Sequence, residues 1–157
     1  MATPDYVLSL RERIGHDLLW MTGVTAIVLS LDWTEMLAVR RRDNGQWTPV
    51  TGIIDPGEEP AVAAEREVLE EAGVTCRAMR LIDVRSLPPM VYANGDRAQY
   101  LDLCFLCVHE GGEPHPADGE NTEARWFPVA EPPPMNDRFT DMLAIALEDR
   151  PEARFRR

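Results

Sequence analysis

The chain contains no lysine, and all 16 of its basic residues are arginine. Against 27 aspartates and glutamates, these arginines leave a formal net charge of −11 at pH 7. A protein that binds nucleic acid or a membrane surface normally presents a basic face, so we expect neither partner. An anionic small molecule remains compatible with this charge if a metal ion bridges it to the protein.

Cysteines and long apolar runs are also scarce. The three cysteines, Cys76, Cys104 and Cys107, lack the number and spacing of a disulfide framework, which favours reduced thiols in the core. Cys104 and Cys107 form a CxxC pattern, but the segment YLDLCFLCVH is typical of a strand, in which an odd offset sends two side chains to opposite faces. No apolar run approaches the ~20 residues of a membrane span, and the N-terminus does not read as a signal peptide. We therefore expect a cytoplasmic protein.

The length of 157 residues and a hydrophobic content of 45% suit a single domain, residues 1–157, which can bury about two thirds of its unfolded surface. Residues 1–22 are expected to form an N-terminal helical extension, with amphipathic spacing over 5–19. Apolar alternation predicts strands, and capping and helical periodicity predict helices. The expected strands are 25–31, 35–41, 76–86, 99–109 and 123–129, the expected later helices are 60–72 and 137–149, and 87–98 and 110–121 are expected loops. This order predicts a mixed α/β domain with helices packed on a sheet.

The most distinctive segment is the helix expected from Pro60 to Ala72, which begins with proline and stops at Gly73. Val62 and Leu69 form a minor apolar flank of this helix. Its main apolar stripe consists of small side chains suited to close packing on a sheet: Ala61, Ala64, Val68 and Ala72.

Three glutamates, Glu67, Glu70 and Glu71, share another side of this helix at spacings of three and four residues. Such spacings bring Cβ atoms to within about 5–6 Å, where like charges repel. A hard divalent cation such as Mg²⁺ or Mn²⁺ relieves that repulsion, because it prefers oxygen ligands. Arg66 lies four residues before Glu70 and is placed to hold its carboxylate. On charge pattern alone, a solvated acidic face is the alternative.

The turn before the helix, GIIDPGEE, adds a second indication of a site. Gly52 and Gly57, with Pro56, allow the backbone to approach a ligand closely. The N-terminus of the following helix favours a phosphate or carboxylate group.

Residues 52–74 resemble the Nudix box, a glycine-led loop followed by a helix with the pattern Arg-Glu-apolar-any-Glu-Glu. The segments LAVRRRDNGQWTPVTG and EARWFPVAEPPP are similar to the flanking segments of that family. One departure is Val50-Thr51-Gly52, where many members have Pro-Gly-Gly. Every defined position of the box is filled: Gly52, Glu58, Arg66, Glu67, Val68, Glu70, Glu71, Gly73 and Val74.

The resemblance implies an α/β/α sandwich of the Nudix type, with a mixed central sheet and the catalytic helix directly after the box loop. It implies hydrolysis of a nucleoside diphosphate linked to another group, with Mg²⁺ or Mn²⁺ as cofactor. Arg66 would orient a catalytic glutamate, and Glu58 would support the metal site. The metal ligands would be the carbonyl of Gly52 and the carboxylates of Glu67, Glu70 and Glu71.

A general base is expected from the loop before the last strand, where Asp118, Glu120 and Glu123 lie. Glu120 is our choice, which makes the catalytic set Arg66, Glu67, Glu70 and Glu120. The alternative is that these acids only keep a surface loop hydrated.

Residues outside the box are expected to select the substrate. In the family, a proline about fifteen positions past the box marks many ADP-ribose hydrolases, and a later tyrosine marks some dinucleoside polyphosphate hydrolases. Pro88-Pro89 and Tyr92 satisfy both marks, although two prolines are also ordinary turn residues. Arg41 is expected to bind a phosphate, and Trp47 and Tyr92 are expected to contact the base, with core or rim packing as the alternative.

These observations favour a hydrolase of ADP-ribose-like nucleotides. A second enzyme hypothesis is a house-cleaning nucleoside-triphosphate pyrophosphohydrolase. A hypothesis of another class is a non-catalytic nucleotide sensor, although such domains commonly lose box glutamates. The sequence leaves open a homodimer formed through the N-terminal helix.

Overall fold

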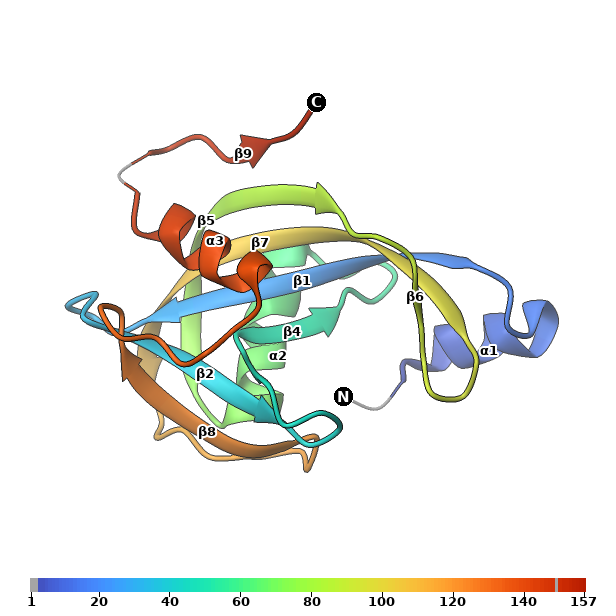
Figure 1. Cartoon of the computed structure of the whole chain (residues 1–157), viewed down its shortest axis with the longest axis horizontal. Helices are drawn as coiled ribbons and strands as arrows, with labels where there is room; N and C mark the ends of the chain where they lie inside the picture. Colours follow the sequence, from blue (N-terminus) through green and yellow to red (C-terminus); the bar gives the residue numbers. More distant parts are fainter. Residues whose placement is uncertain (1–2, 149) are drawn as a thin grey trace.

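The computed structural model describes residues 3–148 and 150–157 and has three layers (Figure 1). A mixed sheet lies between helix α2 (Pro60–Ala72) on one face and helix α3 (Asp137–Ala146) on the other. Two apolar cores fill the spaces, one under α2 around Val68 and one under α3 around Met142. This is the α/β/α sandwich that the resemblance to the Nudix family implies.

The described strands form one sheet in the order β3-β2-β1-β7-β5-β9. Strand β4 also pairs with β1, β6 with β7 and β8 with β2. The pairs β1–β7 and β5–β9 are parallel, and the others are antiparallel. The strands are β1 (Leu19–Leu29), β2 (Glu35–Arg41), β3 (Trp47–Thr48), β4 (Val50–Ile53), β5 (Thr75–Ser86), β6 (Met90–Val91), β7 (Arg97–Gly111), β8 (Asn121–Pro128) and β9 (Arg154–Phe155).

Strand β1 pairs with different strands along its length, and this pairing positions the start of the Nudix box. It pairs with β2 only where Leu29 faces Met36, and nearer the N-terminus of the strand Val24 faces Gly52 of β4. The loop after β4 then leads directly into α2, which packs on the same face of the sheet. Gly52 is therefore held by the sheet beside the glutamates of α2.

Strand alternation is visible at the cysteines. Cys104 lies in the core under α3 and Cys107 in the core under α2, so the CxxC side chains point to opposite faces as expected. All three cysteines are free and buried. None of the helices in the described residues has the length and apolar content needed to cross a membrane.

The expected N-terminal helical extension over residues 1–22 is too long. Helix α1 covers only Asp5–Ile14 and ends at Gly15, whose φ is +56°. Residues 19–22 belong to β1, because they pair in parallel with residues 98–101 of β7. The predicted strand at 25–31 therefore starts six residues earlier, at Leu19, since long-range pairing outweighs the local amphipathic pattern. Residues 1 and 2 lie outside the described part of the chain.

Other expected boundaries shift by smaller amounts. Strand β7 runs to Gly111 and β8 begins at Asn121, so the expected loop at 110–121 shortens to 112–120. Asn136 caps α3, accepting a hydrogen bond from the amide of Phe139 at 3.1 Å. The helix ends at Ala146 rather than 149, a residue outside the described part. Strand β9, not predicted from the sequence, pairs with β5.

Candidate metal centre

Two of the three helix glutamates are fully buried. Glu67 and Glu71, one turn apart on α2, are each only 1% exposed, because they share the side of the helix that faces the sheet. Glu70 lies at the rim, and its side chain is 50% exposed. The helical spacing predicts one group of three carboxylates, whereas the packing of α2 divides it into a buried pair and an exposed third member.

The buried pair is incompletely hydrogen-bonded. Among the described residues, Oε2 of Glu67 and Oε1 of Glu71 have no hydrogen-bond partner. Burial raises the pKa of Glu67 to about 7, against the opposing effect of Arg66. Burial likewise raises the pKa of Glu71 to about 7, against a hydrogen bond from Asn121. Two buried carboxylate oxygens without donors suit Mg²⁺ or Mn²⁺, which bind carboxylate oxygen.

Gly52 of β4 lies against one member of this pair, Glu67. A Cβ atom at position 52 would lie 2.2 Å from both Cγ and Cδ of Glu67, so no larger residue fits without displacing that carboxylate. The backbone of β4 therefore approaches Glu67 directly. The ligand role of the Gly52 carbonyl stays a prediction.

Arg66 connects the other carboxylates of the box. Its Nε and Nη2 donate to the two oxygens of Glu58 at 2.8 and 2.9 Å, a bidentate pair. Its Nη1 donates to Glu67 at 2.9 Å and to Glu70 at 3.1 Å, the latter being the contact expected from the four-residue spacing. The hydrogen bond to Glu58 is the main reason why the pKa of Arg66 is raised. Arg66 thus links Glu58 to Glu67 and Glu70, and the supporting role of Glu58 stays a prediction.

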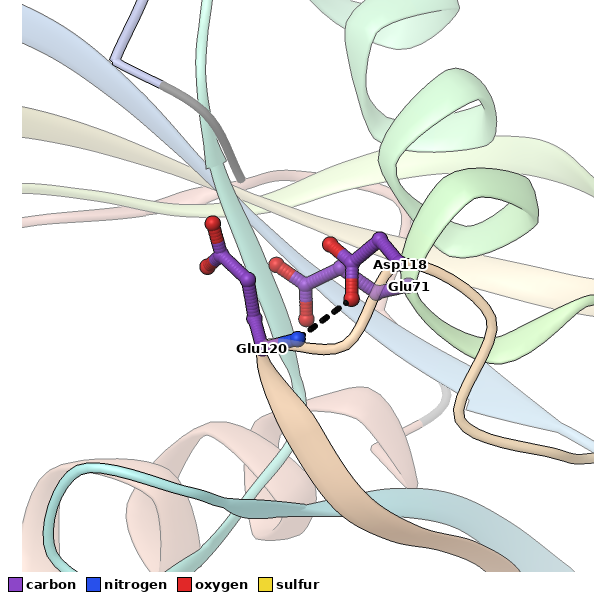
Figure 2. Close-up of side chains that lie close together, drawn as sticks. All are labelled: Glu71, Asp118 and Glu120. Atoms are coloured by element: carbon purple, nitrogen blue, oxygen red, sulfur yellow. Dashed lines mark hydrogen bonds between the residues drawn. The ribbon is translucent and has the colours of Figure 1, made fainter.

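The loop before β8 brings two further acids to this centre. Single carboxylate oxygens of Glu71, Asp118 and Glu120 all lie within 4.8 Å of one another. Figure 2 shows Glu71 at the end of α2, with Asp118 and Glu120 on the segment that leads into β8. Glu123, the remaining acid considered for the base, lies away from this group and pairs with Arg40 and Arg125.

Asn121 is a site residue that the sequence reasoning missed. Its side chain is fully buried and its Nδ2 donates to Oε2 of Glu71 at 3.0 Å. Among the described residues, its Oδ1 has no hydrogen-bond partner. A single asparagine at the end of an acidic loop has no spacing that would distinguish it from a turn residue.

A cavity of about 820 Å³ opens beside the acids and is lined by Gly52, Glu71 and Glu120 at that end. Its volume lies in the range of about 300–1,000 Å³ that is typical of small-molecule sites. Arg41 and Tyr92 also line it. Arg41 is held by Asp43 at 3.2 Å, and the hydroxyl of Tyr92 meets that of Tyr100 at 2.6 Å.

Trp47 does not lie in this cavity, contrary to the expectation that it contacts a base. It is not among the described residues that line the cavity. Its ring packs edge-on against Phe127, with 4.8 Å between ring centroids, at the margin of the core under α3. Trp47 is half-buried by this packing, which is the alternative that the sequence left open.

The cavity wall also contains a buried polar group that the sequence does not indicate. Asp102, 4% exposed, accepts a hydrogen bond from Thr25 at 2.9 Å and one from Arg138 at 3.2 Å. Burial raises the pKa of Asp102, and Arg138 opposes the shift. All three residues line the cavity, which therefore has a polar wall on the α3 side.

Comparison with known proteins agrees with these features. A family model described as NUDIX domain matches residues 20–144. The chain is 31% identical to a MutT-like protein of Streptomyces ambofaciens over 127 residues, covering 81% of this chain and 74% of that protein. It is 32% identical to the 8-oxo-dGDP phosphatase NUDT18 of Mus musculus over 149 residues, 90% of this chain and 41% of that protein. It is 33% identical to the NAD-capped RNA hydrolase NudC of Deinococcus radiodurans over 109 residues, 68% of this chain and 36% of that protein.

The chain therefore spans less than half the length of the NUDT18 and NudC relatives. Among solved structures, it is similar to an ADP-ribose pyrophosphatase from Streptococcus suis, with a TM-score of 0.67 and 22% identity. That similarity covers 87% of this chain and 98% of the other, and at this identity it establishes the fold.

Proposed function

The chain belongs to the NUDIX family of hydrolases, and from that premise we propose that it hydrolyses a pyrophosphate bond in a nucleoside diphosphate linked to another group, with Mg²⁺ or Mn²⁺. The observation that carries the proposal is the pair of buried glutamates. Glu67 and Glu71 each keep a carboxylate oxygen that has no partner among the described residues. Such an arrangement is costly for folding alone and is explained by a cation that takes those oxygens as ligands.

The box residues have separate roles in this proposal. Glu67, Glu70 and Glu71, with the carbonyl of Gly52, are the proposed ligands. When bound, the cation would neutralise phosphate charge and lower the pKa of an attacking water. Arg66 holds Glu67 and Glu70 in orientation, so that they need not reorganise when the substrate arrives.

Residues outside the box supply the remaining functions. Glu120 is the proposed general base, because it lines the cavity and lies beside Glu71. Asn121 keeps Glu71 oriented through its Nδ2 donor. Arg41 and Tyr92 line the cavity and are the proposed contacts for phosphate and for the rest of the substrate.

ADP-ribose-like nucleotides are the substrates we propose first, because Pro88-Pro89 match the family's mark for ADP-ribose hydrolases, while Tyr92 matches the mark of some dinucleoside polyphosphate hydrolases. A second candidate is a house-cleaning nucleotide pyrophosphohydrolase. It is supported by the similarity to a MutT-like protein and to an 8-oxo-dGDP phosphatase. The third hypothesis, a non-catalytic nucleotide sensor, is disfavoured because every defined position of the Nudix box is filled.

The test is product formation from a nucleotide panel with Mg²⁺ or Mn²⁺, followed by chromatographic separation. The panel contains ADP-ribose, dinucleoside polyphosphates, nucleotide sugars, normal and oxidised nucleoside triphosphates and NAD-capped RNA. We expect metal-dependent cleavage, with one class preferred, that falls by orders of magnitude in Glu71→Gln. Glu123→Gln is the matched control, because Glu123 pairs with Arg40 and Arg125 away from the site. Tight binding of one nucleotide without cleavage would favour the sensor.

A further inference from the structure

The acid loop, residues 112–120 between β7 and β8, carries the two acids that approach Glu71. Residues 112–117 of this loop are attached to the C-terminus of α2. The amide of His115 donates to the carbonyl of Ala72 at 3.0 Å, and the amide of Ala117 donates to that of Glu71 at 3.2 Å. Carbonyls in the last turn of a helix lack donors within the helix. The acid loop supplies these donors and is thereby fixed to α2, the helix that carries the proposed metal ligands.

Close packing reinforces this attachment. A Cβ atom at Gly73 would lie 2.0 Å from Cε1 of His115. A Cβ atom at Gly112, where φ is +85°, would lie 2.5 Å from the carbonyl oxygen of Gly73. The contact at Gly112 is with backbone, and the φ of +67° at Gly73 favours glycine there, so the start of the acid loop lies directly on the end of α2.

The second half of the acid loop, which contains the acids, is held from the other side by Arg42, the residue that follows β2. Its Nε donates to the carbonyl of Gly119 at 2.6 Å, and its backbone amide donates to the carbonyl of Glu120 at 2.9 Å. Gly119 lies between Asp118 and Glu120 in the chain. A change in the Gly119 peptide therefore reorients both carboxylates.

A separate observation at Glu71, which these acids face, indicates that a ligand binds there. Glu71 is 1% exposed and its Oε1 has no hydrogen-bond partner among the described residues, yet it lies in the group with Asp118 and Glu120 (Figure 2). We propose that Arg42 is a positioning residue, whose guanidinium holds the Gly119 carbonyl and thereby keeps Asp118 and Glu120 in place for the cation at Glu71. The inference rests on the proposed function.

The chain offers a matched control in the same run of arginines. Arg40 is also exposed, and it bonds to Glu123 at 2.9 Å and to the carbonyl of Gly45 at 3.1 Å. Neither partner belongs to the acid loop. Arg40→Met and Arg42→Met thus remove the same charge from neighbouring exposed positions, and only the second removes the contact with Gly119.

The experiment compares wild type, Arg42→Met, Arg42→Lys and Arg40→Met, without relying on activity alone. Mn²⁺ affinity is measured by electron paramagnetic resonance, and exchange of the acid-loop amides is measured by NMR. We expect Arg42→Met to weaken Mn²⁺ binding about 10- to 100-fold, the range typical when a residue outside the ligand set that supports a metal site is removed. Exchange should accelerate at residues 115 and 117–120, and kcat should fall more than KM rises. Arg42→Lys keeps a cationic donor and should recover part of the affinity, while Arg40→Met should match wild type.

The proposal is overturned if Arg42→Met and Arg40→Met have the same Mn²⁺ affinity and the same acid-loop exchange. It is also overturned if exchange in Arg42→Met rises equally in α2 and the central strands, because that pattern reports lost global stability. Failure of the proposed function gives a different result. The wild type then cleaves no nucleotide of the panel, while Mn²⁺ affinity and amide exchange still test the role of Arg42.

Discussion

Replacing Glu67 with glutamine should remove a large part of the pH dependence of stability in the metal-free protein. Burial raises the pKa of Glu67 from an ordinary value of 4.5 to about 7. Between these values the folded state binds a proton that the unfolded state has released, so stability falls as the pH rises from about 4.5 to about 7. From about pH 5 to about pH 8, this single group should lower the free energy of unfolding by about 2 to 3 kcal/mol.

The assay is urea unfolding in EDTA at several pH values, for wild type and Glu67→Gln. The glutamine keeps an oxygen that can accept the hydrogen bond from Arg66, and any cost of burying its amide is independent of pH. The variant should therefore lose about 2 to 3 kcal/mol less than wild type over this range. Added Mg²⁺ should raise the melting temperature of wild type at high pH and have little effect on the variant, because a proposed ligand is gone.

Glu70→Gln is the matched control, since it makes the same chemical change at a position of the same helix that lies at the rim of the site. The Glu70 side chain is 50% exposed, and repulsion from it is the smallest of the causes that raise the pKa of Glu67, so Glu70→Gln should change the pH dependence far less than Glu67→Gln. Parallel pH curves for wild type and Glu67→Gln would refute the argument, because they would show that burial of Glu67 imposes no cost on its ionised form.

Three further predictions test other parts of the structure. Gly52→Ala places a Cβ 2.2 Å from Glu67, so it should abolish the increase in melting temperature caused by Mg²⁺. Asn136→Ala removes the cap of α3 and should lower the free energy of unfolding by about 1 kcal/mol in urea titrations. Trp47→Ala should lower the free energy of unfolding, because it removes the packing on Phe127. Its KM should stay within about twofold of wild type, the resolution of a steady-state assay, if Trp47 lies outside the cavity.

The sequence alone determined the features that depend on short spacings. The limits of α2 follow from Pro60 and Gly73, and the contact between Arg66 and Glu70 follows from a four-residue helical offset. The opposite placement of Cys104 and Cys107 follows from strand alternation. These features are fixed by local backbone geometry, which the order of residues specifies directly.

Only the tertiary structure decided which acids become buried together. Glu67 and Glu71 are buried and Glu70 is not, because the stripe of small side chains on α2 packs on the sheet and sets the rotation of the helix. Asp118 and Glu120 reach Glu71 because β8 pairs with β2 and brings the acid loop against the end of α2.

The contacts of Arg42, Asn121 and Trp47 have the same origin. Arg42 and Gly119 are 77 residues apart in the chain, and Asn121 and Glu71 are 50 apart. Trp47 packs on Phe127, which β2 brings alongside by pairing with both β3 and β8. Contacts between distant segments depend on how the strands pair and how the helices pack, and a local pattern of residues carries little information about either.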